Sequence, residues 1–265
     1  MGLTSLRERL LGVPASRILL GLDFDGTLAP IVPDPEQAAP DPHAVTLLSE
    51  LSQCLQRVVI ISGRDTDFLV SRLPLPHALF IGNHGLEERQ DGASRVVAEA
   101  QPYLKRLRRA ADAVAALPQA RAAGIVIERK RAAISVHFRQ ASDPSASEAA
   151  LQPAMQQIAR HEQLQLQPGR LLWELRPPIE IDKGEVLRRL AVALQPAGLV
   201  YAGDDRTDAS AFSALKGMAG RRTVAVGVRS AEVADDLFVD CDLMVDGVPG
   251  VTHLLTQLLD VCANA

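Results

Sequence analysis

The chain has 265 residues, of which 47% are hydrophobic, so it is long enough for one large domain or for a core domain that carries an insertion. Its 28 basic and 32 acidic residues leave a net charge of −4, which excludes a general attraction to nucleic acid or to an anionic membrane. An anionic ligand would therefore need local cations or a metal ion to hold it.

The cysteine content indicates a cytoplasmic protein. Cys54, Cys241 and Cys262 are odd in number, and no two of them form a close pair. This argues against a disulfide framework or a zinc site and favours a reducing compartment. No segment resembles a signal peptide or approaches the roughly 20 apolar residues of a membrane span. We expect no membrane, nucleic-acid or obligate protein partner.

The predicted elements begin with short apolar strands that alternate with amphipathic helices. Near the start, strands are predicted over 17–22, 58–61 and 78–81, with helices over 42–56 and from about residue 65. In the last third, helices are predicted over 183–194, 205–215 and 251–261, with strands over 199–202, 223–228 and 243–245. This alternation predicts a Rossmann-like α/β core, a parallel sheet with helices on both faces.

The middle of the chain follows a different pattern, helix, strand, strand, which occurs twice. The six segments are 101–117, 124–128, 133–138, 145–161, 164–167 and 171–175. Turn-sized gaps separate the paired strands, which predicts antiparallel hairpins. We therefore expect a core of residues 1–90 and 178–265 and an inserted α+β domain of residues 91–177. Linkers are expected near residues 88–93 and 177–178.

The strongest chemical signal follows the first predicted strand, where the chain continues Asp23-Phe24-Asp25-Gly26-Thr27. Two carboxylates at the carboxyl end of a buried strand lie where open α/β sheets bind ligands. Burying them is costly unless a cation or protons compensate their charge. A bare Asp-Gly turn is usually solvated, but the preceding apolar strand favours a functional site.

Two later strand ends carry further polar groups. Ser62 could hydrogen-bond a phosphoryl oxygen, although Ser-Gly-Arg loops are common. Asp204 follows the strand at 199–202, and Asp205 and Asp208 come soon after it. Magnesium prefers oxygen ligands, so Asp204 is the predicted direct ligand, with the other two acids in its outer shell. For Asp208, an acid at an exposed helix N-terminus is a strong alternative.

Lys183 begins a predicted helix, with Asp182 as its possible N-cap. A lysine is unfavourable at the positive end of a helix dipole, so a phosphate or an aspartate partner would explain it. An exposed lysine is the simpler alternative. The basic run at 105–109 is expected to form the solvated face of a helix.

The motifs together, Asp-x-Asp-Gly-Thr, a hydroxyl after the second strand, a lysine and Gly-Asp-Asp-x-x-Asp, resemble the haloacid-dehalogenase phosphatase superfamily. The resemblance covers the whole predicted core. It implies a phosphatase domain, and the inserted helix-strand-strand repeat resembles the C2-type cap that closes over small substrates in this superfamily and selects them.

Other segments are similar to those of trehalose-6-phosphate phosphatases. They are 61–65, 82–87, 128–130, 137–139, 174–177 and 203–208. By this resemblance, Glu128, Lys130 and Arg139 of the cap would contact the sugar phosphate. Glu174 would bind sugar hydroxyls.

The same resemblance places Arg64 and the loop of Asn83, His84 and Gly85 at the mouth of the site. Asn83 departs from the serine or valine more usual at that position. Without the resemblance these positions are less specific, because a lone histidine such as His84 is more often structural than catalytic.

A mechanism with Mg²⁺ would follow from the resemblance. Asp23 would attack phosphorus and form an aspartyl-phosphate, and Asp25 would protonate the leaving sugar oxygen and then accept a proton from water. Ser62 and Lys183 would hold the phosphoryl oxygens. The metal ligands would be the carboxylates of Asp23 and Asp204 and the backbone carbonyl of Asp25. The implied activity is hydrolysis of trehalose 6-phosphate.

Three other functions are less favoured. The main competitor is a phosphatase for another sugar phosphate, such as sucrose 6-phosphate or mannosylglycerate phosphate. A catalytically silent regulatory module is disfavoured because Asp23, Asp25, Lys183 and Asp204 are all present. A phosphotransferase or mutase is disfavoured because the cap resembles a hydrolase type.

Overall fold

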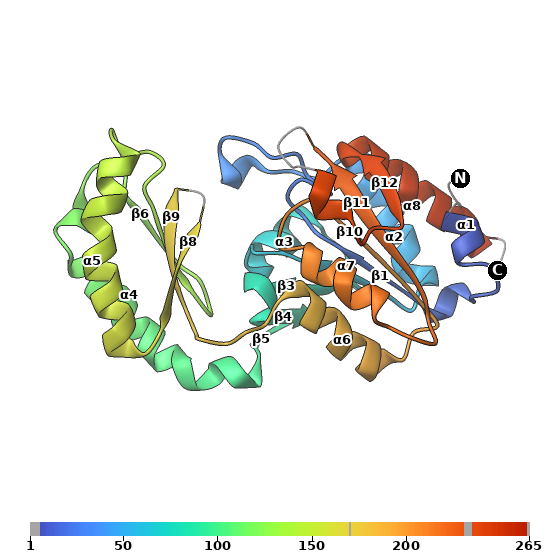
Figure 1. The fold of residues 1–265 in the computed structure, drawn as a ribbon, viewed down its shortest axis with the longest axis horizontal. Helices are drawn as coiled ribbons and strands as arrows, with labels where there is room; N and C mark the ends of the chain where they lie inside the picture. Colours follow the sequence, from blue (N-terminus) through green and yellow to red (C-terminus); the bar gives the residue numbers. More distant parts are fainter. Residues whose placement is uncertain (1–5, 170, 231–234, 264–265) are drawn as a thin grey trace. The chain divides into compact units, whose positions relative to one another are not determined.

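The computed structural model describes residues 6–169, 171–230 and 235–263. The chain divides into two compact units (Figure 1). The core unit comprises Met1–Ser94 and Ile181–Ala265, and the inserted unit comprises Arg95–Glu180. The insertion expected from the sequence, residues 91–177, begins and ends a few residues earlier.

The core unit is built on an eight-stranded sheet with the order β12-β11-β10-β1-β2-β3-β4-β5. Its strands are β1 (Ile18–Leu22), β2 (Arg57–Ile61), β3 (Leu79–Gly82), β4 (Glu87–Gln90), β5 (Ala93–Val96), β10 (Gly198–Gly203), β11 (Arg222–Arg229) and β12 (Leu243–Asp246). The strands from β12 to β3 are parallel, whereas β4 runs antiparallel to β3. The predicted Rossmann-like α/β core is confirmed, and its six predicted strands lie within one residue of the observed ones.

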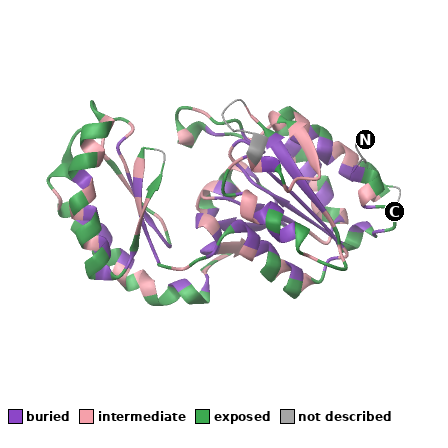
Figure 2. Ribbon diagram, viewed as in Figure 1, coloured by how far each residue is buried: buried purple, intermediate pink, exposed green. Residues whose placement is uncertain are grey.

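Helices cover both faces of the parallel strands, which explains why these strands are apolar on both sides (Figure 2). On one face, Ile18, Leu20 and Leu22 of β1 pack into a cluster with the helices. These helices are α1 (Leu6–Arg9), α2 (Pro42–Cys54), α3 (Thr66–Arg72) and α8 (Gly247–Ala263). The other face packs against α6 (Lys183–Leu194) and α7 (Ala209–Lys216).

A hairpin at the edge of the core sheet was not predicted. The sequence predicts a linker near residues 88–93, but β4 and β5 form there. Asp91 and Gly92 connect them with φ angles of 49° and 80°, the left-handed region that a two-residue hairpin turn requires. The polar residues of β4 and of the edge strand β5 lack the apolar pattern of the buried strands, so the sequence does not indicate a hairpin here.

The inserted unit is a four-stranded antiparallel sheet with the order β6-β7-β9-β8. Its elements are α4 (Leu104–Ala116), β6 (Val126–Arg129), β7 (Ile134–His137), α5 (Pro144–Glu162), β8 (Gln165–Gly169) and β9 (Leu172–Arg176). Both helices pack their apolar stripes on one face of this sheet. The predicted repeat of helix, strand, strand is confirmed, and Lys105 and Arg108 of the basic run are exposed as expected.

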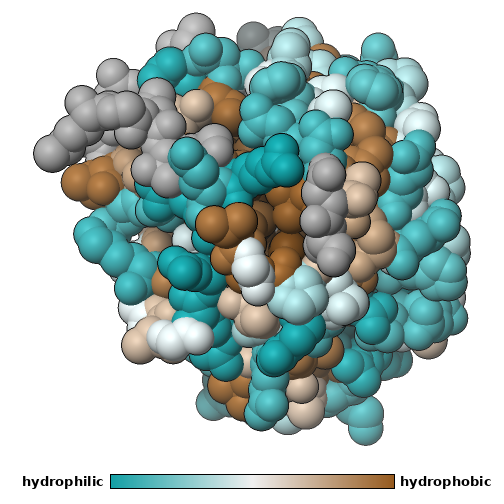
Figure 3. Space-filling model, turned by 90° about the vertical axis from the view of Figure 1, so that its right-hand side faces the viewer, coloured by the Kyte–Doolittle hydropathy of each residue, from teal (hydrophilic) through white to brown (hydrophobic). Residues whose placement is uncertain are grey.

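The surface of the core unit is mostly polar on the face that Figure 3 shows. A smaller group of hydrophobic side chains lies in the middle of this face. Within the described ranges, no helix combines the length and the apolar character that crossing a bilayer requires.

Candidate active site

The carboxyl ends of β1 and β10 bring two of the predicted acids to one edge of the core sheet. The strands pair in parallel with Leu22 opposite Ala202, and the Asp23 N–H extends the pairing by donating to the Ala202 carbonyl oxygen at 3.0 Å. Asp204 follows the end of β10 at Gly203. Asp23 is 5% exposed and Asp204 is 1% exposed. The strand register therefore buries both carboxylates at the position where the sequence predicted them.

Lys183, the first residue of α6, reaches two buried carboxylates. Its Nζ lies 3.1 Å from Asp23 Oδ1 and 2.7 Å from Asp208 Oδ1, and its side chain is 3% exposed. Asp182 is the N-cap of α6, because its Oδ1 accepts a hydrogen bond from the Glu185 N–H at 2.7 Å. The predicted aspartate partner of this lysine is confirmed, and the alternative of an exposed lysine is wrong.

The Asp208 carboxylate accepts four hydrogen bonds. Its Oδ1 accepts hydrogen bonds from Lys183 Nζ at 2.7 Å and from the Tyr201 hydroxyl at 2.5 Å. Its Oδ2 accepts from the N–H groups of Asp204 and Asp205, each at 3.0 Å. Asp208 is fully buried, so the alternative of a solvated acid at a helix end is wrong. It joins the loop after β10 to the lysine of α6.

Burial sets the electrostatics of this cluster. Desolvation raises the pKa of Asp23 well above its usual range, and Lys183 offsets part of that rise. Desolvation, followed by the like charges of Asp208 and Asp205, raises the pKa of Asp204 to about 7. Burial disfavours the charge on Lys183, but the neighbouring carboxylates raise its pKa overall, so it remains protonated. The negative charge that this one lysine leaves uncompensated favours a bound cation.

The same acids fit a metal ion. Oxygen atoms of Asp23, Asp204 and Asp208 lie within 4.8 Å of one another, the spacing that a shared ion needs. Both oxygens of Asp208 are engaged by the four donors described above, so Asp23 and Asp204 are the side chains suited to be ligands. A donor set made only of oxygen suits a hard divalent cation.

The turn after Asp25 is shaped to fit against Asp204. Thr27 Oγ1 donates to Asp204 Oδ1 at 3.1 Å and fixes that carboxylate. Gly26 has a φ of +80°, and a Cβ atom there would lie 2.0 Å from Asp204 Oδ2. Only glycine satisfies both the backbone angle and the close approach.

Arg64 holds the second acid of the first motif. Its guanidinium donates from Nε to Asp25 Oδ2 at 2.9 Å and from the terminal nitrogen to Oδ1 at 2.8 Å, a bidentate pair. The same guanidinium stacks on Phe68, 4.5 Å from the ring centroid. The expected contact of Arg64 with substrate stays a prediction. Its observed partner is the side chain that we expect to transfer protons.

Ser62 and the loop of residues 83–85 follow the neighbouring strands β2 and β3. Ser62 is 2% exposed, and its Oγ accepts a hydrogen bond from the Arg64 N–H at 3.2 Å. Asn83 and Gly85 are buried, whereas His84 is half-buried. The Asn83 side chain turns inward, which leaves His84 as the side chain of this loop that solvent reaches. Substrate binding by these residues stays a prediction.

The four predicted sugar-binding residues belong to the inserted unit. Glu128 and Glu174 lie on either side of Ser135 on adjacent strands, on the sheet face opposite the helices. Glu128 Oε2 is 2.9 Å from His137 Nε2. Lys130 Nζ is 3.9 Å from Glu174 Oε1, and both side chains are mostly buried.

Arg139 follows β7 and is half-buried. The helix-free face of the inserted sheet therefore gathers at least three of the four residues into one polar surface.

Sequence reasoning missed three contributions to the site. Tyr201 lies within an apolar strand and offers no sequence signal for its bond to Asp208. The pairing of Arg64 with Asp25 joins positions that are distant in the chain. Glu87 accepts a hydrogen bond from the Asn83 side chain, but it begins the polar run Glu87 to Gln90, so the local sequence does not indicate its burial.

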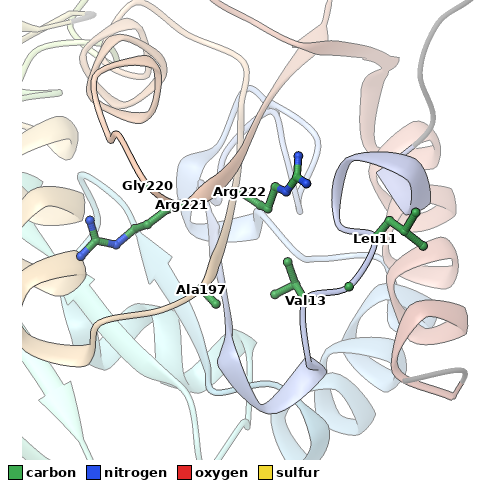
Figure 4. Close-up of a pocket in the computed structure, with 7 residues that line it drawn as sticks. Leu11, Val13, Ala197, Gly220, Arg221 and Arg222 are labelled. Atoms are coloured by element: carbon green, nitrogen blue, oxygen red, sulfur yellow. The ribbon is translucent and has the colours of Figure 1, made fainter.

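A pocket of about 470 Å³ lies elsewhere on the core unit (Figure 4). Residues 11–13, Ala197 and Arg222 help to line it. Ala197 directly precedes β10 and Arg222 begins β11. The pocket is therefore at the amino ends of these strands, whereas the acids lie at the carboxyl ends, and it is separate from the candidate active site.

Several known proteins similar to this chain are described as trehalose-phosphate phosphatases. The family model for trehalose-phosphatase matches residues 21–240. The trehalose-phosphate phosphatase of Mycobacterium avium (strain 104) is 35% identical over 206 residues, which cover 74% of this chain and 50% of that protein. That of Mycobacterium marinum (strain ATCC BAA-535 / M) is 34% identical over 235 residues, covering 84% and 57%. This chain thus spans about half the length of these curated relatives.

Solved structures have the same fold. A trehalose-6-phosphate phosphatase related protein superposes with a TM-score of 0.76 at 24% identity and covers 93% of this chain and 99% of its own. The Aspergillus fumigatus trehalose-6-phosphate phosphatase gives a TM-score of 0.64 at 25% identity, with 98% of both chains covered. The family model spans the acids of β1 and β10, Lys183 and the whole inserted unit. The chain belongs to the trehalose-phosphatase family.

Proposed function

We propose that this chain is a phosphomonoester hydrolase that converts trehalose 6-phosphate to trehalose and phosphate through an aspartyl-phosphate on Asp23. The observation that carries the proposed chemistry is the contact of the buried Asp23 with Lys183, at 3.1 Å, beside a cluster of acids suited to a cation. The choice of sugar is supported by the family and by the relatives named trehalose-phosphate phosphatase.

In the first half-reaction, an oxygen of Asp23 attacks phosphorus in line and the bond from phosphorus to the sugar oxygen breaks. Asp25 gives a proton to the departing sugar oxygen. Lys183 and Ser62 hold phosphoryl oxygens as the loose transition state passes, and the charge on Lys183 suits that task because its pKa is raised.

In the second half-reaction, Asp25 accepts a proton from water while that water attacks the aspartyl-phosphate. Phosphate leaves and Asp23 is regenerated. The bidentate pair with Arg64 suits the ionised form of Asp25, which is the form that accepts this proton, and it orients the carboxylate.

Mg²⁺ is the metal we propose, held by the Asp23 and Asp204 carboxylates and the Asp25 carbonyl. When bound, such an ion would offset the negative charge of the nucleophile and of the phosphate. A small divalent ion with all-oxygen ligands and few carboxylates fits this donor set.

The inserted unit is proposed to act as the cap that recognises the sugar. Glu128, Lys130, Arg139 and Glu174 supply acceptors and donors for hydroxyl groups and for phosphate. A surface with both acidic and basic side chains suits a substrate in which a neutral disaccharide carries an anionic phosphate. We also propose a cytoplasmic location, because three widely spaced cysteines suit a reducing compartment.

The test is phosphate release from a panel of sugar phosphates, with and without Mg²⁺. We expect trehalose 6-phosphate to be the best substrate and chelation to abolish turnover. Asp23→Asn should remove activity while the circular dichroism spectrum stays unchanged. Near-normal activity of Asp23→Asn would contradict the mechanism.

The panel also tests the identity of the sugar separately from the catalytic mechanism. Stronger turnover of sucrose 6-phosphate or mannosylglycerate phosphate than of trehalose 6-phosphate would overturn the proposed substrate but leave the nucleophile in place. No turnover of any member by the metal-loaded protein would favour the silent regulatory module.

A further inference from the structure

Glu87, the first residue of β4, is a buried carboxylate that the proposed mechanism does not use. It has no measurable exposure to solvent. Its Oε1 accepts a hydrogen bond from Thr66 Oγ1 at 2.6 Å, and its Oε2 accepts one from Asn83 Nδ2 at 2.7 Å. A buried carboxylate is costly, so it persists only where hydrogen bonds compensate it. One donor, Asn83, lies at the start of the turn after β3, and the other, Thr66, lies at the end of the loop after β2.

The loop that Glu87 holds has an unusual backbone. Asn83 and His84 have φ angles of 50° and 54°, so two consecutive residues other than glycine adopt the left-handed conformation. Asparagine tolerates this region, but histidine adopts it less readily. Such a conformation persists only where the surroundings impose it, and it is often found where function requires an exact position. The bond from Glu87 to the Asn83 side chain is one constraint that imposes it.

The 83–84 loop in turn contacts the loop after β2. The Asn83 N–H donates to the Arg64 carbonyl oxygen at 2.9 Å, and the His84 N–H donates to the Ser62 carbonyl oxygen at 3.1 Å. The His84 ring lies so close to Gly63 that a Cβ there would be 2.6 Å from its Cε1. The position of the 83–84 loop therefore determines where Ser62 and Arg64 lie.

Thr66 connects Glu87 to the same loop from its other end. It is the first residue of α3, two positions after Arg64, and is fully buried. Glu87 thus bonds the end of the 62–66 segment directly and its middle through Asn83, whose N–H donates to the Arg64 carbonyl oxygen. Arg64 extends from this segment to hold Asp25.

We propose that Glu87 is a positioning residue for the reaction. It fixes the Asn83–His84 turn, which places the Ser62 hydroxyl for the phosphoryl group and the Arg64 guanidinium for Asp25. Because Glu87 bonds Thr66 and Asn83, it acts through these residues and not on the reacting atoms. This inference rests on the proposed function, because it assigns Ser62 and Asp25 the roles given above.

The variant Glu87→Gln tests the claim. The introduced amide has a single oxygen, so it cannot accept from both Asn83 and Thr66, and any bond that remains lacks the charge of the carboxylate and is weaker. We expect kcat to fall about tenfold or more with KM nearly unchanged, since a shift of about 1 Å can cost about 100-fold in rate. The matched control is Glu88→Gln, the half-buried neighbour on β4, which should keep the wild-type kcat.

A second exchange shows whether the bond itself matters. Combining Asn83→Asp with Glu87→Gln reverses the pair, so that the introduced amide donates to the introduced carboxylate. Aspartate tolerates the left-handed region, as asparagine does. We expect the double variant to regain most of the lost kcat. Asn83→Gly, which permits the same backbone but lacks the side chain, should lower kcat and serves as the test if Glu87→Gln does not fold.

A spectroscopic signature separates positioning from general stability. The chain has six histidines, and His84→Gln assigns the His84 Cε1–H resonance. We expect the chemical shift of this resonance to change in Glu87→Gln and to regain its wild-type value in the double variant. The resonances of the other histidines should not change.

An unshifted His84 resonance in Glu87→Gln, or a loss of kcat no greater than that of Glu88→Gln, would overturn the inference. Failure of the wild type to hydrolyse trehalose 6-phosphate would instead contradict the proposed function, and the resonance would still report the position of the turn.

Discussion

Asp208 and Lys183 form a buried ion pair, 2.7 Å long, that also fixes the loop carrying Asp204. The same lysine contacts Asp23 at 3.1 Å. Asp208 has no direct role in the proposed reaction, but it positions Lys183 and the loop of Asp204, which do have one. This arrangement predicts that Asp208 matters for both stability and turnover.

We expect Asp208→Asn to lower the free energy of unfolding by about 3 kcal/mol, because removing one partner of a buried pair leaves the other charge poorly compensated. Turnover should fall at least about tenfold as Lys183 and the Asp204 loop shift. Denaturant unfolding and phosphate release measure the two effects.

The control is Asp240→Asn, which removes a carboxylate from an equally short pair with the mostly exposed Lys216. Surface pairs contribute little, so neither stability nor turnover should change appreciably. Equal effects of the two substitutions would show that burial of the Asp208 pair has no special consequence.

Gly26→Ala is expected to abolish activity through crowding. The added Cβ would lie 2.0 Å from an oxygen of Asp204, so that carboxylate must move. Metal binding, measured by calorimetry with Mg²⁺, should weaken together with turnover.

Gly92→Ala separates crowding from backbone strain. Gly92 has the same φ of +80°, but no atom lies within 4 Å of the position that a Cβ would take. Both glycine variants should lose about 1 kcal/mol of stability from backbone strain. Only Gly92→Ala should retain activity. Full activity in Gly26→Ala would show that Asp204 tolerates displacement.

Arg64→Lys is expected to lower kcat about tenfold in a folded protein. A lysine is a point charge and cannot reproduce the two parallel bonds to Asp25, so the acid loses its fixed orientation. Arg72→Lys is the matched control, because Arg72 stacks on the same Phe68 ring, 5.3 Å from its centroid. Comparable losses of kcat in both variants would assign the effect to the ring rather than to Asp25.

Acid should weaken the inserted unit through Glu162. Hydrogen bonds from Arg109 lower the pKa of this carboxyl below its usual 4.5, and the side chain is 6% exposed. A lowered folded pKa means that the stabilisation is complete above 4.5 and is lost as the pH falls through the folded value. The stability difference between wild type and Glu162→Gln should therefore be largest near pH 7 and vanish in strong acid.

Unfolding of the inserted unit, followed by tryptophan fluorescence across that range, measures this difference. Trp173 packs in its core and is the chain's single tryptophan. Asp112→Asn removes an exposed acid paired with Arg129 and should show almost no pH-dependent difference. A stability difference for Glu162→Gln that did not shrink in acid would contradict the assignment.

The proposed catalytic acids of the core could be predicted because they directly follow apolar strands. Asp23 and Asp204 each end an apolar run, and parallel strands bring such ends together without further information. Lys183 was predictable because a cation at a helix start is unfavourable unless an anion accompanies it. In both cases a local cost in the sequence indicates a compensating partner.

Other features depend on tertiary packing alone. Nothing near Tyr201 indicates that its hydroxyl meets Asp208, and nothing near Arg64 selects Asp25 rather than substrate. The β4–β5 hairpin was missed because its solvated strands lack apolar alternation, although Asp91-Gly92 is a recognisable turn signal. The left-handed Asn83–His84 turn contacts Glu87, a buried residue that the local sequence does not single out.

The chain passes between the two units at two points, Ser94–Arg95 and Glu180–Ile181. Both points belong to segments that the core holds firmly: β5 ends the sheet, and Ile181 is buried against Gly85. A segment attached in this way is interchangeable in principle. If the inserted unit recognises the sugar as we propose, exchanging residues 97–180, which follow β5, would change the sugar that is bound and leave every proposed catalytic group in place.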